Sequence, residues 1–342
     1  MSEKPKFGMY WAASCGGCEI ATLNIHEKVL VVDEIFDIAF WPVAADFKYE
    51  HVRNYPDGYI DLCLFNGAIR SSENEEIAKL LRKKSKFLVA FGSCAYEGCI
   101  PALSNLTSKE ATLNTVFIDN ESIDNPEGIV PQPVTKVEEG ELYIPYMYNT
   151  VKSLDQVVDV DYTIPGCPPE PHQIWAVLEV VVGALTQGAA LPPKGSIVGA
   201  GEVALCEECP LEKNTKTIDR FYRPYEITPE PSVCLLEQGL VCLGPATRSG
   251  CGARCPQVGM GCRGCYGGLG DVEDQGGRML AAIASVIEAS GVPGESEAAI
   301  EKRINDALDT IPDPVGTFYR FSMAHSILHR AKTNGHNGKG DA

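Results

Sequence analysis

Cysteine is the residue type whose number and spacing in this sequence point most directly to chemistry. The chain of 342 residues contains fourteen cysteines. Two residues between cysteines let both thiolates face one metal centre, so a Cys-x2-Cys pair is typical of a redox dithiol, half a zinc site or half an iron–sulfur site. Three such pairs are present: Cys15 and Cys18, Cys206 and Cys209, and Cys262 and Cys265.

Composition and the N-terminal residues argue against structural disulfides and against a nucleic-acid partner. The beginning of the chain, MSEKPKFGMYWAASC, shows no secretory or twin-arginine signal, and no run of 18 apolar residues predicts a membrane span. We therefore expect a cytoplasmic protein, in which thiols stay reduced and a disulfide framework is disfavoured. The net charge of −17 argues against nucleic acid as a partner, because phosphates repel an acidic surface.

The elements that must position the first cysteines have an α/β pattern. Short apolar runs alternate with segments of helical spacing, and this alternation predicts a doubly wound parallel sheet. The segment Ser71–Glu73 opens the charged helix at 75–84, with serine as a plausible N-cap. The predicted strands are residues 7–12, 36–41, 60–65 and 87–91, and the predicted helices are residues 20–30, 75–84 and 170–185.

Four cysteines follow the ends of predicted strands. Cys15 and Cys18 come after the first strand, Cys94 after the fourth, and Cys167 after a further strand candidate at residues 162–164. The carboxyl ends of parallel strands share one edge of the sheet, where ligands bind. The four thiols are therefore predicted to converge, and four thiolates suit either a 4Fe-4S cluster or tetrahedral zinc.

The second half of the chain has a different character. Residues 206–265 contain eight cysteines with many glycines and prolines, so metal would have to supply the organising contacts that a core cannot. Eight thiols divide into two sets of four, although spacing alone permits other partitions. The predicted sets are Cys206, Cys209, Cys234 and Cys242, and Cys251, Cys255, Cys262 and Cys265.

Pro192 and Pro193 mark a predicted domain boundary. We expect one domain at residues 1–192, with a long irregular insertion at 101–152, and a second at residues 193–342. The second domain is predicted to be rich in loops and to end in helices at 277–289, 297–308 and 318–331. Residues 333–342 are predicted to form a disordered tail.

Two further cysteines, one glutamate and two histidines each have a functional and a structural interpretation. Cys63 lies in mid-strand and is expected to be a buried apolar residue. Cys99 could lie near the first thiol set, but packing is the favoured interpretation. Glu19 fits a proton path toward a partner, and more simply a carboxylate at a helix start. His325 and His329, four apart on a predicted helix, are expected at a solvated or subunit-facing surface.

Several motifs together resemble the small subunits of NiFe hydrogenases. These are Trp11–Glu19 (WAASCGGCE), Gly92–Ala95 (GSCA) and Pro165–Pro169 (PGCPP). The run from Cys234 to Cys265 resembles the cytoplasmic subclass that includes the methyl-viologen-reducing, deazaflavin-non-reducing enzymes. The blocks extend from residue 11 to residue 265 and are specific only as a group.

The resemblance implies a fold and a cofactor set. It implies a flavodoxin-like first domain with a proximal cluster on the set that contains Cys15. It implies a distal cluster on the set that contains Cys206 and a medial cluster on the set that contains Cys251. Periplasmic relatives have His at the position of Cys206 and only three medial cysteines. This chain has Cys at 206 and a fourth medial thiol at Cys255, so three 4Fe-4S clusters are expected.

The resemblance also implies partners. The Ni-Fe site of the family lies on a separate large subunit, so no catalytic residue is expected on this chain. The chain would relay electrons from that site through the proximal, medial and distal clusters to a further acceptor subunit. The rival interpretations are a respiratory-complex-like iron–sulfur subunit, a zinc-stapled interaction protein, and a relative that couples hydrogen to NADP or a deazaflavin.

Overall fold

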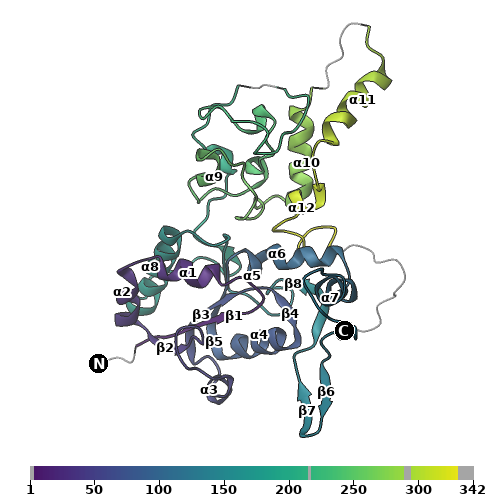
Figure 1. Cartoon of the computed structure of the whole chain (residues 1–342). Coiled ribbons are helices and arrows are strands. Elements are labelled where there is room, and N and C mark those ends of the chain that lie inside the picture. The colour runs from purple at the N-terminus through teal and green to yellow at the C-terminus, as the bar shows by residue number, and fades with distance from the viewer. Residues whose placement is uncertain (1–3, 215–216, 289–293, 330–342) are drawn as a thin grey trace. The chain divides into compact units, whose positions relative to one another are not determined.

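The computed structural model describes residues 4–214, 217–288 and 294–329. The chain divides into two compact units (Figure 1). The first unit runs to Val198 and includes the segment that starts at Met323, and the second unit is Gly199–Ser322. Within the described residues, no helix is both long and apolar enough to cross a membrane.

A six-stranded parallel sheet forms the centre of the first unit. Its order is β10-β9-β5-β3-β1-β2, the order of a flavodoxin-like sheet with one strand added, and every pair in it is parallel. The predicted α/β fold is thus confirmed. The strands are β1 (Lys6–Trp11), β2 (Asp37–Phe40), β3 (Ile60–Asn66), β5 (Ser85–Phe91), β9 (Tyr162–Ile164) and β10 (Ser196–Ile197).

Side chains of the central strands alternate between two apolar layers. In β3, Leu62 and Leu64 pack under α1 (Gly17–Leu23), α2 (Lys28–Ile35) and α8 (Pro171–Gln187). Cys63 and Phe65 point to the opposite layer, under α3 (Tyr49–Asn54) and α4 (Ser72–Lys84). Figure 1 shows these two groups of helices on opposite faces of the sheet. Cys63 is fully buried, which confirms its predicted role in packing.

The helix boundaries predicted for the first unit agree with the structure at α4 and differ from it at residues 20–30. Ser71, one of the two adjacent serines considered as N-cap, caps α4 by accepting a hydrogen bond from the Asn74 amide at 3.3 Å. The single helix predicted at residues 20–30 is wrong. α1 stops at Leu23, and His26 adopts a left-handed conformation (φ 59°) before α2 begins, so the chain turns between two shorter helices.

The predicted insertion contains regular elements of its own. It begins within α6 (Cys99–Ala102) and includes the short 3-10 helix η1 (Leu103–Leu106) and α7 (Lys109–Phe117). It continues with an exposed hairpin of β6 (Val134–Val137) and β7 (Gly140–Tyr143). The insertion ends with β8 (Met147–Lys152), which pairs antiparallel with β4 (Ile69–Ser71) beside the main sheet.

The second unit contains mostly loops and short helices. Its longer helices are α10 (Gln275–Val286) and α11 (Glu297–Leu308), close to two of the predicted segments. The helix predicted at 318–331 is wrong, because α12 spans only Pro314–Phe318 and turns and bends follow it up to residue 328. The last two residues of that predicted helix, and the predicted disordered tail, lie outside the described residues. The short elements are η2 (Leu205–Glu207), η3 (Leu236–Gln238), η4 (Gly244–Ala246) and α9 (Arg254–Gln257).

Residues 323–329 return to the first unit and are bound there by side chains. His325 Nε2 lies 2.7 Å from Ser153 Oγ and 3.0 Å from Asp155 Oδ1. The buried Asn105 amide donates to the His329 carbonyl at 3.1 Å. Burial lowers the pKa of His325, but the hydrogen bond and charge of Asp155 outweigh it, so the net pKa is raised. His325 is therefore partly buried in an intramolecular clasp and not at the predicted surface, whereas His329 is exposed, as predicted.

This clasp predicts a pH-dependent contribution to stability. Because the pKa of His325 is raised by folding, the contribution is complete below the unfolded pKa of about 6.5 and disappears as pH rises through the folded value. We expect His325→Gln to cost about 0.5 kcal/mol at pH 6, as for a partly exposed ion pair, and less at pH 8.5. Thermal unfolding at both pH values measures the difference, with exposed His172→Gln as the control. An equal deficit at both pH values would contradict the ionic role.

Candidate metal centres

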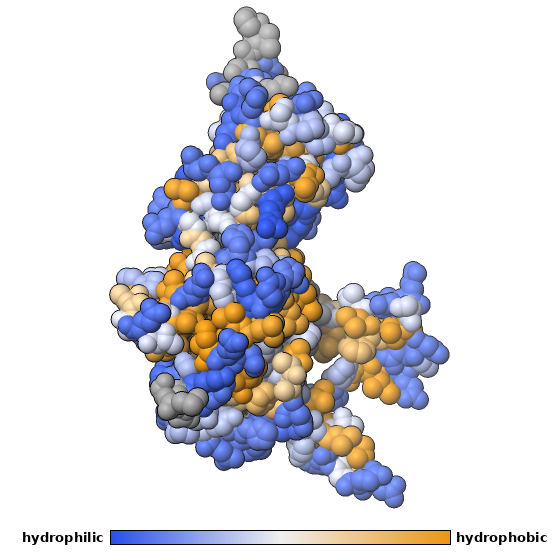
Figure 2. Space-filling model, turned by 90° about the vertical axis from the view of Figure 1, so that its left-hand side faces the viewer, coloured by the Kyte–Doolittle hydropathy of each residue, from blue (hydrophilic) through white to orange (hydrophobic). Residues whose placement is uncertain are grey.

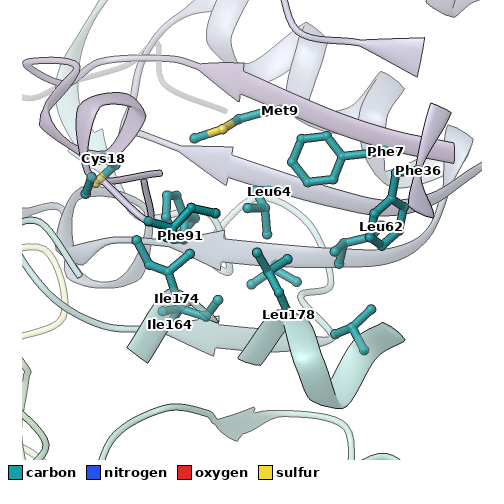
Figure 3. Packing of buried hydrophobic residues seen from close by; sticks show 14 of the residues in the cluster. Phe7, Met9, Cys18, Phe36, Leu62, Leu64, Phe91, Ile164, Ile174 and Leu178 are labelled. Carbon is teal, nitrogen blue, oxygen red and sulfur yellow. The ribbon is translucent and has the colours of Figure 1, made fainter. Parts of the chain in front are cut away.

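The first thiol set lies where three strands of the sheet end. Cys15 and Cys18 follow β1, Cys94 lies in α5 (Ser93–Glu97) directly after β5, and Cys167 follows β9. Cys18 lies at the end of the apolar core opposite Phe36 (Figure 3). Burial raises the pKa of Cys18, and the neighbouring Cys94, Cys167 and Cys15 raise it further. The structure therefore brings these four sequence-predicted thiols together.

Glycines let the three loops approach one another. A Cβ on Gly92 would lie 2.4 Å from Cys18 Sγ, and the φ of Gly92 is 83°. The amides of Gly92 and Ser93 donate to the carbonyls of Ile164 and Gly166, each at 2.8 Å, and so join the loop after β5 to the loop after β9. The sequence analysis assigned no role to Gly92 or Gly166, although Gly92 lies two residues before Cys94 and Gly166 lies directly before Cys167.

Cys99 belongs to the same cluster of thiols, although packing was the favoured prediction for it. Its Sγ donates to Cys167 Sγ across 3.8 Å, and its side chain is fully buried. The contact with Cys167, then the contact with Cys94 and burial, raise the pKa of Cys99. The hydrogen bond from Cys99 in turn lowers the pKa of Cys167. In this contact Cys99 is the donor and Cys167 is the acceptor.

Glu19 is a buried carboxylate next to Cys18 in the first turn of α1. Its Oε2 accepts a hydrogen bond from Trp41 Nε1 at 2.6 Å, and Oε1 has no hydrogen-bond partner among the described residues. Burial raises the pKa of Glu19 to about 7, and the Trp41 hydrogen bond opposes that rise. A carboxyl group with this pKa can hold or release a proton near neutral pH.

In the second unit, one cavity gathers the thiols of the predicted distal set. Cys206, Cys209, Cys234 and Cys242 all line it, together with leucines such as Leu205 and Leu211. Burial raises the pKa of Cys206 to about 12, with Cys242 adding to the rise and Lys213 opposing it. The cavity has the donor set for a four-thiolate metal group in apolar surroundings.

The predicted medial set is placed in two neighbouring pairs. Cys251 lies near Cys255, and Cys262 lies near both Cys265 and Cys242. The Cys262 amide donates to Cys242 Sγ at 3.2 Å, so this pair lies directly beside the cavity. Their grouping into one four-thiol set stays a prediction. No trio of His, Cys, Asp or Glu in the described parts of the chain is spaced to hold a single metal ion.

Glu208, between the two cysteines of one pair, is a positioning residue that sequence analysis missed. Its Oε1 accepts hydrogen bonds from the amides of Gly250, Gly252 and Ala253 at 3.0, 3.1 and 3.3 Å. Cys251 Sγ also lies 3.9 Å from the same oxygen. The carboxylate therefore orders the loop that carries Cys251. Sequence spacing could not have revealed this contact, because 42 residues separate Glu208 from Gly250.

Comparison with known proteins places these thiols in a family. The chain is 37% identical over 331 residues to a subunit of the F420-non-reducing hydrogenase of Methanothermobacter thermautotrophicus, covering 96% of this chain and 97% of that protein. The chain belongs to the NiFe-hydrogenase small-subunit family. The iron-sulfur subunit of the F420-non-reducing hydrogenase of Archaeoglobus profundus is 35% identical, covering 95% of this chain and 98% of its own length.

Two further matches cover a smaller share of this chain than those hydrogenase subunits do. A family described as NADH ubiquinone oxidoreductase, 20 Kd subunit, matches residues 15–181, which lie within the first unit. The structure of an NAD+-reducing NiFe-hydrogenase in the H2-reduced state is 28% identical, covers 53% of this chain and 92% of that chain, and has a TM-score of 0.45. The hydrogenase relatives, in contrast, also span the cysteine-rich second unit.

We predict that Gly92→Ala disrupts the first thiol set. The added Cβ would collide with Cys18 Sγ, and such overpacking typically costs about 1–3 kcal/mol. Gly188→Ala is the matched control, because Gly188 also has a positive φ (69°) but a Cβ there meets nothing within 4 Å. Thermal unfolding and bound iron per chain measure the effect. Equal stability and iron content in the two variants would show that the close approach is unimportant.

Proposed function

We propose that this chain is the electron-transfer subunit of a cytoplasmic NiFe hydrogenase and holds three 4Fe-4S clusters. The observation that carries the proposal is the convergence of four thiols from three strand ends, in a chain of the small-subunit family. The proximal cluster is assigned to Cys15, Cys18, Cys94 and Cys167. The distal cluster is assigned to Cys206, Cys209, Cys234 and Cys242, and the medial cluster to Cys251, Cys255, Cys262 and Cys265.

The residues present fit such groups by the chemistry of their donors. Cys18 and Cys94 are buried and Cys15 is exposed, so the first set extends from the core to the surface of its unit. The cavity around Cys206 combines four thiols with leucine side chains, and an apolar surrounding of this kind limits solvent access. When bound, iron–sulfur clusters supply one-electron transfer at potentials set by charge, hydrogen bonds and exposure.

The chain's own residues have three tasks in this function. Cysteine thiolates hold the iron, backbone and side-chain donors contact the sulfurs, and the apolar layers exclude water from the inner side. Glu19 places a buried carboxyl group beside Cys18, and burial raises its pKa to about 7, so it can hold or release a proton there. We assign no catalytic residue to this chain, because hydrogen activation in the family takes place at a Ni-Fe site on a large subunit.

The proposed partners are that large subunit and a further electron acceptor near Cys206. The relatives are named as subunits of hydrogenases, which implies an assembly. Figure 2 shows apolar surface gathered on the face of the first unit that carries α1, α2 and α8. Exposed apolar patches of this kind mark interaction sites. The exposed apolar residues of these helices are Ile20, Leu23, Leu30, Val31 and Val180.

Metal analysis tests the cofactor assignment. We expect about twelve irons per chain in protein purified anaerobically, as three four-iron clusters require. Nickel should accompany the chain only when a large subunit is co-purified. Zinc in place of iron, with colourless protein, would support a zinc-stapled interaction protein and overturn the electron-transfer proposal.

Replacement of one ligand tests the proximal assignment. We expect Cys167→Ser, in the assembled hydrogenase, to lower hydrogen-dependent dye reduction by about a hundredfold or more, since even outer-shell changes cost roughly 10–100-fold at metal sites. Cys63→Ser is the control, because Cys63 is a buried cysteine on β3 outside all three sets. Full activity in a fully assembled Cys167→Ser enzyme would contradict the assignment.

A further inference from the structure

The first thiol set has a fifth member that the cluster assignment does not use. Cys99 is fully buried, its Sγ lies 3.8 Å from Cys167 Sγ, and it also contacts Cys94. Cys63, the other cysteine outside the assigned sets, is equally buried but packs with Phe65 and Leu88 in the layer under α4. Burial therefore does not by itself explain the position of Cys99 among the ligand thiols.

The backbone takes an unusual course to place Cys99. Gly98 and Cys99 are consecutive residues with positive φ, 84° and 49°. A Cβ on Gly98 would lie 2.7 Å from the Cβ atoms of both Ala102 and Ala324, so only glycine fits there. A side chain at φ 49° is strained, and such strain persists where the surroundings enforce it. Glycine at residue 99 would relieve the strain, but it would also remove the thiol that contacts Cys167.

The thiol of Cys99 is suited to donate to ligand sulfur. A neutral S–H group is a hydrogen-bond donor, and a metal-bound thiolate is an acceptor with no proton of its own. The geometry has Cys99 as the donor and Cys167 as the acceptor. A donor to ligand sulfur stabilises the more negative, reduced form of an iron–sulfur group, and hydrogen bonds of this kind raise its reduction potential.

We propose that Cys99 is a positioning and tuning residue whose S–H group donates to the thiolate of Cys167 and raises the potential of the metal group on the first thiol set. The inference rests on the proposed function, because it requires a cluster on that set. Cys99 is not one of the four ligands in this proposal. Its removal should leave the cluster in place and change the energy of its reduced state.

The test is a redox titration of the assembled hydrogenase followed by electron paramagnetic resonance. The proximal signal is the one that Cys15→Ser abolishes or alters. We expect Cys99→Ala to keep the iron content and to disfavour reduction by about three- to tenfold, the upper value corresponding to a shift of about −59 mV for one electron. Cys99→Ser retains a donor and should shift the potential less. Cys63→Ala is the control: it deletes a buried thiol on the other face of the sheet and should leave the proximal potential unchanged.

The possible outcomes separate this inference from the function on which it rests. An unchanged proximal potential in an iron-replete Cys99→Ala enzyme would overturn the tuning role, and packing would then be the only role of Cys99 that the structure supports. Loss of the proximal signal in both Cys99→Ala and Cys99→Ser, with Cys63→Ala intact, would make Cys99 a ligand and equally overturn it. Absence of iron from wild-type protein would instead overturn the proposed function. A negative shift in Cys99→Ala that Cys99→Ser reduces would support the inference.

Discussion

The close approach of backbone to sulfur at the carboxyl edge of the sheet is the constraint on which the first unit depends. Residue 92 has no room for a side chain, because Cys18 Sγ occupies the place of its Cβ. The same turn donates two amide hydrogen bonds, one to the last residue of β9 and one to the loop that follows it. Three loops thus share one small volume, and each must take the path that the other two allow. The thiols converge because of that packing.

The two units reach their thiol arrangements by different means. In the first unit, two extensive apolar layers enclose the sheet, and the ends of rigid strands fix the loops. The second unit relies more on individual polar contacts, such as those of Glu208 with three backbone amides. Burial there raises the pKa of Cys206 to about 12 and that of Cys242 to about 11, so four thiolates require a compensating positive charge. Because burial also raises the pKa of Cys18 in the first unit, metal binding would contribute to the folding of both units.

The sequence by itself determined the class of the fold and the chemistry of its donors. Apolar runs with turn residues at their ends predicted β1, β3, β5 and β9, because buried parallel strands require continuous hydrophobic segments. The position of cysteines after those strands was enough to predict that they meet, since parallel strands share one carboxyl edge. Helices were predicted less well, as the break at His26 and the turns after α12 show, because local spacing does not reveal where a chain must bend.

Tertiary structure alone decided which residues surround the donors. Cys99 joins Cys167 across 68 residues, and Glu208 joins Gly250 across 42. Residues 323–329 return to the first unit through contacts with Ser153, Asp155 and Asn105. No sequence period encodes such contacts, since they arise from the packing of segments brought together by the whole fold. Donor types follow from local sequence, whereas the hydrogen bonds, burial and electrostatic environment of each donor follow from its neighbours in space.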